Sequence, residues 1–120
     1  MVLVDTSVWV AHLRQTDRRL SALLEEGRVA VHPFVIGELA CGRLRNRREI
    51  LSLLRALPEA PVVNLSELLH TIERHALPAC GIGFVDAHVL ASAELMGVSL
   101  WTLDKPLDAV AGRLRLAYKP

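Results

Sequence analysis

The sequence has little that would direct the protein to disulfide bonding, a structural metal or a membrane. It holds only two cysteines, Cys41 and Cys80, and their spacing fits neither a redox motif nor a zinc site. No apolar run is long enough to cross a bilayer, and no basic segment precedes the apolar start, which Asp5 interrupts. We therefore expect two free thiols and a cytoplasmic protein without membrane binding.

A dominant net charge is also absent. The chain has 14 basic and 13 acidic side chains, which gives a formal charge of +1. The field of the whole molecule therefore gives no reason to expect nucleic-acid binding, which would need a local basic patch. Apolar residues make up 52% of the 120 residues, enough for a hydrophobic core. We expect one domain spanning residues 1–120.

Short apolar runs alternate with helical patterns, which predicts an α/β protein with a mainly parallel sheet covered by helices on both faces. Five strands are expected, at residues 2–4, 29–31, 61–65, 99–102 and 114–117. Helices are expected over residues 8–13, 20–26, 34–43, 47–57, 66–75, 85–96 and 105–111. Ser66 is the predicted cap of the helix that runs to about residue 75.

Acidic residues follow two of the expected strands. Asp5 ends the run Val2–Val4, and Asp104 follows Ser99–Thr102. Ligands bind beyond the carboxyl ends of the strands in an open parallel sheet, so these carboxylates converge if the two strands are neighbours. A helix cap is the simpler alternative for Asp5. Asp108 is an alternative to Asp104, which we favour because it directly follows the strand.

Two further acids lie inside apolar helical segments. Glu38 stands in PFVIGELACG and Asp86 in GFVDAHVLASAEL. Asp86 as a first-turn helix acid and Glu38 as a solvent-facing residue are the simpler alternatives. Four carboxylates at one sheet end would repel one another, and a hard divalent cation, Mg²⁺ or Mn²⁺, would relieve that repulsion. Such a site suits phosphodiester hydrolysis by an activated water.

The order of these residues resembles the PIN domain, and more narrowly the VapC-type ribonuclease toxins of toxin–antitoxin pairs. The resemblance rests on hydrophobic-Asp-Thr-Ser at the N-terminus, a Glu after the second strand, an Asp-Ala pair opening an Ala-rich helix, and Gly-Val-Ser-Leu-Trp-Thr-Leu-Asp. It implies a three-layer sandwich with strand order 3-2-1-4-5, which makes strands one and four neighbours. It also implies an endoribonuclease that depends on Mg²⁺, with Mn²⁺ as a substitute.

The resemblance also assigns roles to residues. The implied catalytic quartet is Asp5, Glu38, Asp86 and Asp104. Asp5 and Asp86 would be direct metal ligands, while Asp104 and Glu38 would bind metal as well, act through water or orient the nucleophile. The hydroxyls of Ser7 and Thr102 would hold the carboxylates in place. An RNA substrate, a homodimer and a VapB-like antitoxin that blocks the site are the implied partners.

Basic residues gather in one stretch soon after Glu38. A phosphate backbone near the acidic site is one ligand for this stretch, and the alternatives are a solvated loop or contact with an antitoxin. The residues that we consider for RNA contact are Arg43, Arg45, Arg47 and Arg48. The histidines do not cluster along the sequence and none is assigned to catalysis or metal binding, whereas Trp9 and Trp101 are expected in the core.

Two other functions compete with the nuclease. A non-catalytic PIN-like module that binds RNA or protein is the main alternative, although such a module has no reason to retain four mutually repelling acids. A phosphatase of the haloacid dehalogenase type also begins with an Asp after its first strand. That chemistry needs a second Asp two positions later, where this chain has Ser7.

Overall fold

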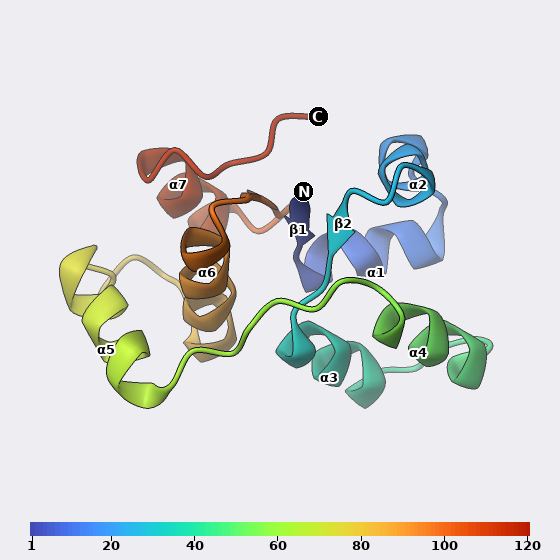
Figure 1. Ribbon diagram of the computed structural model, residues 1–120, viewed down its shortest axis with the longest axis horizontal. Helices are drawn as coiled ribbons and strands as arrows, with labels where there is room; N and C mark the ends of the chain where they lie inside the picture. Colours follow the sequence, from blue (N-terminus) through green and yellow to red (C-terminus); the bar gives the residue numbers. More distant parts are fainter.

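A three-stranded parallel sheet lies at the centre of the fold, with seven helices around it (Figure 1). The structure, a computed structural model, describes residues 1–120. The elements in chain order are β1 (Val2–Val4), α1 (Thr6–Arg14), α2 (Arg18–Glu25), β2 (Val29–Ala30), α3 (Pro33–Cys41), α4 (Arg47–Arg55), α5 (Leu65–Arg74), α6 (Phe84–Met96), β3 (Ser99–Trp101) and α7 (Lys105–Arg113).

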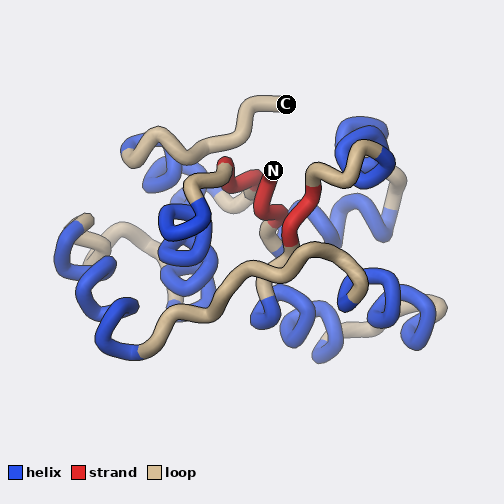
Figure 2. The backbone as a smooth tube through the Cα atoms, viewed as in Figure 1, coloured by secondary structure: helices blue, strands red, loops and turns tan.

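β1 is the central strand, and the strand order is β2-β1-β3. Leu3 pairs in parallel with Ala30 on one side and with Leu100 on the other, and all three side chains are fully buried. Figure 2 shows the short strands between two groups of helices, with α5 to α7 on one side and α1 to α4 on the other. The predicted α/β class with a parallel sheet is therefore confirmed, and strands one and four of the sequence prediction are neighbours.

The third expected strand, residues 61–65, does not form. Only an isolated parallel bridge joins Val31 to Glu59, supported by a 2.8 Å hydrogen bond from the N–H of Ala60 to the carbonyl of Val31. Pro58 precedes this bridge and has no N–H to donate to a ladder. Because β2 ends at Ala30 and α3 begins at Pro33, the neighbouring strand also offers no further partner after Val31, and the pairing stays a single bridge.

The fifth expected strand, residues 114–117, is also reduced to a single bridge, between Leu100 and Ala117. Arg115 has a φ of 61°, a left-handed conformation that interrupts an extended chain. The main chain still bonds to the edge of β3, because Leu100 donates to the carbonyl of Leu116 at 2.7 Å and accepts from Tyr118 at 2.9 Å. The sheet that forms has the order β2-β1-β3, and the two isolated bridges at its edges do not make up the five strands of the predicted order 3-2-1-4-5.

Helix boundaries differ from the prediction at several ends, and the cap of α5 is a residue that we did not expect. Asn64, not Ser66, caps α5: its side chain accepts from the N–H of Glu67 at 2.8 Å. The carboxylate of Glu67 in turn accepts from the N–H of Asn64 at 3.0 Å, which completes a capping box. None of the helices is both long enough and apolar enough to span a bilayer.

The sheet and the helices around it share one hydrophobic cluster of 22 buried side chains. The strands contribute only two or three residues each. Truncation of one buried side chain in β3 therefore removes a large part of the packing that the sheet itself provides. We predict that Leu100→Ala, at a position 0% exposed, lowers the free energy of unfolding by about 2–5 kcal/mol.

Urea denaturation measures this loss. The matched control is Leu95→Ala in the last turns of α6, where the side chain is 60% exposed and truncation should change stability little. Equal losses at the two positions would contradict the placement of the core.

Candidate active site at the carboxyl end of the sheet

Asp5 directly follows β1 and occupies the N-cap position of α1, yet its side chain makes no capping hydrogen bond. Its Oδ2 accepts two other hydrogen bonds, from the hydroxyl of Thr102 at 2.7 Å and from the hydroxyl of Ser7 at 2.9 Å. The residue is only 5% exposed. The capping alternative for Asp5 is therefore wrong, and its carboxylate is turned toward the end of the neighbouring strand β3.

The two hydroxyls that hold Asp5 also position the chain after β3. Ser7 Oγ accepts from the N–H of Leu103 at 2.9 Å, and Thr102 Oγ1 accepts from the N–H of Asp104 at 3.0 Å. The two hydroxyl oxygens lie 3.3 Å apart. Each hydroxyl thus donates to Asp5 and accepts from the backbone that leads to Asp104, which fixes the relative positions of these two acids.

Asp104 is the N-cap of α7, and its Oδ2 accepts from the N–H of Leu107 at 3.0 Å. Leu107 is fully buried, so this cap fixes α7 against the core. Asp108 is exposed one turn further along α7 and takes part in no side-chain hydrogen bond. The geometry supports the preference for Asp104 over Asp108 as the acid at this sheet end.

Glu38 and Asp86 approach the same region from α3 and α6. Glu38 is exposed to solvent, and its Oε1 accepts from the hydroxyl of Thr6 at 2.6 Å. Asp86 is partly buried in the first turn of α6, where its Oδ2 accepts from the N–H of Gly83 at 3.0 Å. Sequence reasoning missed the role of Thr6, although its place between Asp5 and Ser7 in the same motif was a signal.

Electrostatic coupling links these acids. Burial is the main cause that raises the pKa of the Asp86 carboxyl, and the hydrogen bond from Gly83 opposes it. The negative charges of Asp5, Asp104 and Glu38 raise the pKa of Asp86 further. The sheet end therefore carries negative charge that no basic side chain of the protein neutralises by an ion pair.

Each of these four carboxylates has one oxygen in a hydrogen bond with the protein and a second oxygen without such a bond. The second oxygens are Asp5 Oδ1, Asp86 Oδ1, Asp104 Oδ1 and Glu38 Oε2. In the arrangement seen, no three acidic, imidazole or thiol side chains are close enough to hold one metal ion. The donor set is nevertheless all oxygen and all anionic, which fits a hard divalent cation such as Mg²⁺ or Mn²⁺.

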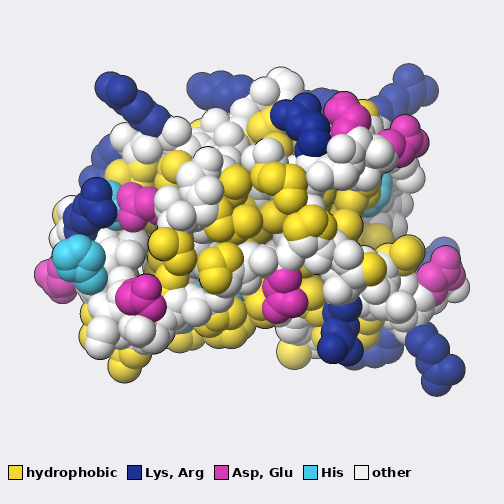
Figure 3. Space-filling model, in the orientation of Figure 1, with side chains coloured by type: hydrophobic (Ala, Val, Ile, Leu, Met, Phe, Trp, Pro, Cys, Tyr) yellow, Lys and Arg dark blue, Asp and Glu magenta, His cyan; other side chains and the backbone are white.

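The arginines considered for RNA contact separate into different surroundings. Arg43 and Arg45 line a cleft of about 580 Å³ together with Thr6, Glu38 and Arg14. Lys and Arg side chains lie mainly around the rim of the face in Figure 3, whereas hydrophobic side chains cover its middle. The lining of this cleft therefore combines one acid of the site, Glu38, with a basic wall made of Arg14, Arg43 and Arg45.

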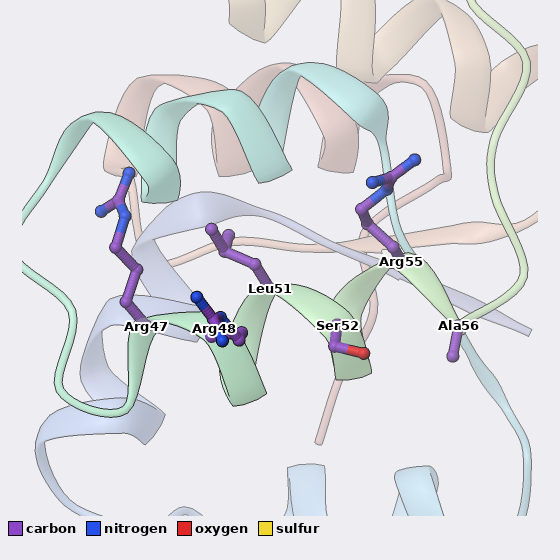
Figure 4. A pocket seen from close by; sticks show the side chains of 6 residues that line it. All are labelled: Arg47, Arg48, Leu51, Ser52, Arg55 and Ala56. Atoms are coloured by element: carbon purple, nitrogen blue, oxygen red, sulfur yellow. The ribbon is translucent and has the colours of Figure 1, made fainter.

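Arg47 does not belong to that wall. Its guanidinium donates to the carbonyls of Ala40 and Gly42 and so satisfies the C-terminal end of α3. Figure 4 shows Arg47 and Arg55 on either side of Leu51 on α4, with Arg48 pointing in another direction. Arg47 thus has a structural role, and Arg48 lies over a separate hollow on α4.

A cluster of four rings near the first turns of α3 and α6 was not expected from the sequence. It contains His32, Phe34, Phe84 and His88. Two histidines that are far apart in the sequence lie close together in space, because the rings of His32 and His88 are 6.2 Å apart. The spacing of Phe84 and His88, four residues apart on one helix face, was the available signal. Trp9 and Trp101 are buried in the core, as expected.

Comparison with known proteins identifies the class to which this arrangement belongs. The family model of the PIN domain matches residues 2–113. The crystal structure of PAE2754 from Pyrobaculum aerophilum is similar over 98% of this chain and 87% of that chain, with a TM-score of 0.71 and 20% sequence identity. The chain belongs to the PIN-domain family.

Sequence relatives define its place in that family more narrowly. Ribonuclease VapC32 of Mycobacterium tuberculosis, in strains CDC 1551 / Oshkosh and ATCC 25618 / H37Rv, is 45% identical over 118 residues. The alignment covers 98% of this chain and 95% of that protein. This chain is therefore a VapC-type PIN protein, and the resemblance inferred from its motifs is confirmed.

The raised pKa of Asp86 gives a prediction about stability. A carboxyl with a higher pKa in the folded than in the unfolded chain keeps its proton longer in the folded state, so stability falls as pH rises through that window. Asp86→Asn retains an oxygen acceptor for the Gly83 N–H but removes the charge. In EDTA, we expect Asp86→Asn to raise the free energy of unfolding at pH 7.

Urea denaturation at a series of pH values tests this expectation. The gain should shrink as the pH falls below the ordinary range of an aspartate, where both proteins are neutral at this position. Asp108→Asn, at an exposed acid, is the control and should change stability little. A gain that does not change with pH, or none at pH 7, would contradict the electrostatic account.

Proposed function

We propose that this protein is an endoribonuclease that depends on Mg²⁺ or Mn²⁺ and hydrolyses phosphodiester bonds in RNA. The proposal is supported by its relatives, which bear the name ribonuclease, and by the acids at the carboxyl end of the sheet. The observation that carries it is Asp5, a nearly buried carboxylate that forgoes its helix cap and keeps one oxygen free. A buried carboxylate that caps no helix contributes little to the stability of that helix, and its unbonded oxygen is available to a ligand.

Asp5, Asp86 and Asp104 would hold the cation through their unbonded oxygens. When bound, a divalent cation supplies Lewis-acid activation of water and neutralises charge that develops on the phosphate. Ser7 and Thr102 keep Asp5 in one orientation, and the bond from Gly83 does the same for Asp86. These contacts pre-organise the acids before substrate arrives.

Glu38 is proposed to accept a proton from the attacking water. It is exposed, Thr6 fixes its Oε1, and its Oε2 is free to accept a hydrogen bond. An in-line attack of this water would then form a new bond to the phosphorus and break the bond to the 3′-oxygen, which takes up a proton from solvent, so that a 5′-phosphate and a 3′-hydroxyl remain. Asp104 would act on the cation and not on the phosphate, because two negative charges repel.

Activity should depend on the cation and on Asp5. With a structured RNA, we expect cleavage in Mg²⁺ or Mn²⁺ and none in EDTA. Asp5→Asn should lower the rate by at least about 100-fold, the loss typical of removing one electrostatic group from an active site. Asp108→Asn, at the exposed acid on α7, should leave the rate close to that of the unaltered protein.

Calorimetric titration with Mn²⁺ separates this proposal from the main alternative, a non-catalytic PIN-like module. Mn²⁺ uptake that weakens in Asp5→Asn supports the nuclease. Cleavage that persists in EDTA or in Asp5→Asn would argue against the mechanism. RNA binding without cleavage and without Mn²⁺ uptake would identify a binding module instead.

Arg43 and Arg45 are proposed to contact the RNA backbone. They line the same cleft as Glu38, so a strand that enters the acidic site would bring its phosphates near these guanidinium groups. Arg48 would contact a more distant phosphate from α4. Arg47 is not included, since its guanidinium bonds to the end of α3.

Salt dependence tests the arginine contacts. For single-stranded RNA in EDTA, each lost phosphate contact should reduce the slope of log affinity against log salt by about 0.7. Arg43→Ala and Arg45→Ala are expected to show this change. Arg28→Ala, at an exposed arginine beside Glu26 at 3.7 Å, is the control and should keep the original slope. An unchanged slope in both cleft variants would exclude these residues.

A VapB-like antitoxin and a second copy of this chain are the proposed protein partners. An apolar hollow of about 320 Å³ between α1, α2 and α4 supports antitoxin binding, since it is lined by Leu13, Leu24 and Leu53 among others. Leu20 and Leu23, which lie close by in sequence, are buried in the core. Two unbridged thiols, Cys41 and Cys80, are consistent with action in the reducing cytoplasm.

A further inference from the structure

The ring cluster of His32, Phe34, Phe84 and His88 has a buried half and an outer half. His32 is 0% and His88 5% exposed, whereas Phe84 is 62% exposed and Phe34 is partly buried. The ring of His88 meets both phenylalanine rings edge-on, with centroid distances of 4.7 Å. The two phenylalanine rings are nearly parallel, with an interplanar angle of 21° and centroids 6.4 Å apart.

The buried half fixes the outer half in place. His32 Nδ1 accepts from the N–H of Phe34 at 2.9 Å, which caps α3 and orients the residue that carries the Phe34 ring. Burial lowers the pKa of His32 to about 4, and it also lowers the pKa of His88. Both imidazoles are therefore neutral at pH 7, and the cluster presents rigid aromatic surface without a charge of its own.

Packing alone does not account for the two imidazoles. His32 Nε2 and His88 Nδ1 are buried without a hydrogen-bond partner, an arrangement less favourable than aliphatic side chains in the same space. The chain has only two phenylalanines, and both belong to this cluster, whereas its two tryptophans are buried elsewhere. Phe84, which is 62% exposed, is therefore the most exposed of the Phe, Trp and Tyr side chains.

The cluster belongs to the two helices that carry Glu38 and Asp86. Phe34 lies one helical turn before Glu38 on α3, so these two side chains share a helix face. Phe84 is linked to that face by its contact with Phe34, because its spacing of two residues from Asp86 places it on a different face of α6. In Figure 1 both helices begin below the sheet, and the contact between Phe34 and Phe84 joins their first turns. The rings therefore adjoin the helix face that carries Glu38.

We propose that Phe84 and Phe34 form a stacking platform for a nucleobase of the RNA, next to the phosphodiester that is cleaved. This inference rests on the nuclease proposal. Every base has an aromatic face, so a platform of this kind positions single-stranded RNA without reading its sequence by hydrogen bonds. His32 and His88 act as positioning residues that keep the two rings nearly parallel.

A nucleobase fits this surface better than an apolar protein segment does. The two rings present flat faces in nearly the same orientation, which suits a planar ligand. Phe34 also shares a helix face with the carboxylate of Glu38, and the apolar hollow between α1, α2 and α4 is a separate feature. A second protein copy seated on Phe84 is the competing occupant, and the experiment below distinguishes it.

Binding of a short single-stranded RNA, followed by fluorescence anisotropy in EDTA, tests the platform. We expect Phe84→Ala to weaken binding by about 5- to 150-fold, the effect of losing one stacked base. Phe84→Trp should bind at least as tightly as the unaltered protein. The slope of log affinity against log salt should not change, because stacking releases no counterions. Leu95→Ala, at an equally exposed residue of the same helix, is the control.

Removing single bases from the RNA adds a second measurement. One abasic position should weaken binding to the unaltered protein and have little further effect on Phe84→Ala. Unchanged RNA affinity in Phe84→Ala would overturn the platform. The platform would also be overturned if Phe84→Trp bound RNA as weakly as Phe84→Ala does. A change of oligomeric state, measured by sedimentation, with unchanged RNA affinity would assign Phe84 to an interface between copies.

These outcomes separate a failure of the platform from a failure of the nuclease proposal. If the unaltered protein binds RNA through Phe84 but never cleaves it with Mg²⁺ or Mn²⁺, the stacking role of Phe84 stands, whereas the nuclease proposal and the position of the platform beside a cleaved phosphodiester both fail. If Asp5→Asn abolishes cleavage while Phe84→Ala binds RNA as the unaltered protein does, the nuclease proposal stands and the platform fails. If the unaltered protein neither binds RNA in EDTA nor cleaves it in Mg²⁺ or Mn²⁺, both the platform and the nuclease proposal are overturned.

Discussion

The hydrogen bond between Thr102 and Asp5, 2.7 Å long, joins two strand ends that are 97 residues apart in the chain. It exists because β1 and β3 pair in parallel, which places the residues that follow the two strands at one edge of the sheet. Thr102 also accepts from the N–H of Asp104, so one hydroxyl sets the position of two acids. The proposed chemistry depends on this contact, since it converts sheet pairing into a fixed geometry of carboxylates.

The sheet that supports this contact is small, yet it is buried on both faces. Its strands contribute two or three residues each, and Leu3 at the centre is fully buried between β2 and β3. A core of this kind is rigid at the point where the acids are attached, although its edges consist of single bridges. Functional groups on the ends of such strands are held more firmly than groups on loops.

Much of this arrangement could be predicted from the sequence because it depends on local patterns that the fold obeys. The run Val2–Val4 followed by Asp5 predicted a strand with an acid at its end, and the pairing of β1 with β3 followed from the resemblance. The outer strands could not be predicted in this way. Apolar composition suggested a strand at residues 61–65, but β2 ends at Ala30 and α3 begins at Pro33, so the pairing stops after one bridge at Glu59.

The contacts of the site were harder to predict than its acids. The hydroxyls of Ser7 and Thr102 were expected to hold carboxylates, but the bond from Thr6 to Glu38 depends on how α1 meets α3. The cluster around Phe84 depends in the same way on how α3 meets α6, which no single stretch of sequence encodes. Contacts between side chains of different helices are thus the feature of the site that periodicity and spacing could not predict.

Two of the acids show how the contribution of a carboxylate to folding stability can differ from its contribution to ligand binding. Asp104 contributes to both, because one of its oxygens caps α7 while the other remains free. Asp86 is different: burial and three neighbouring carboxylates oppose its ionisation, so its charge works against folding at neutral pH. Natural proteins retain unfavourable groups of this kind where a ligand removes the cost, and the proposed divalent cation would do so through its charge. The raised pKa of Asp86 and the unbonded oxygen of Asp5 thus both agree with the cation-binding site proposed above.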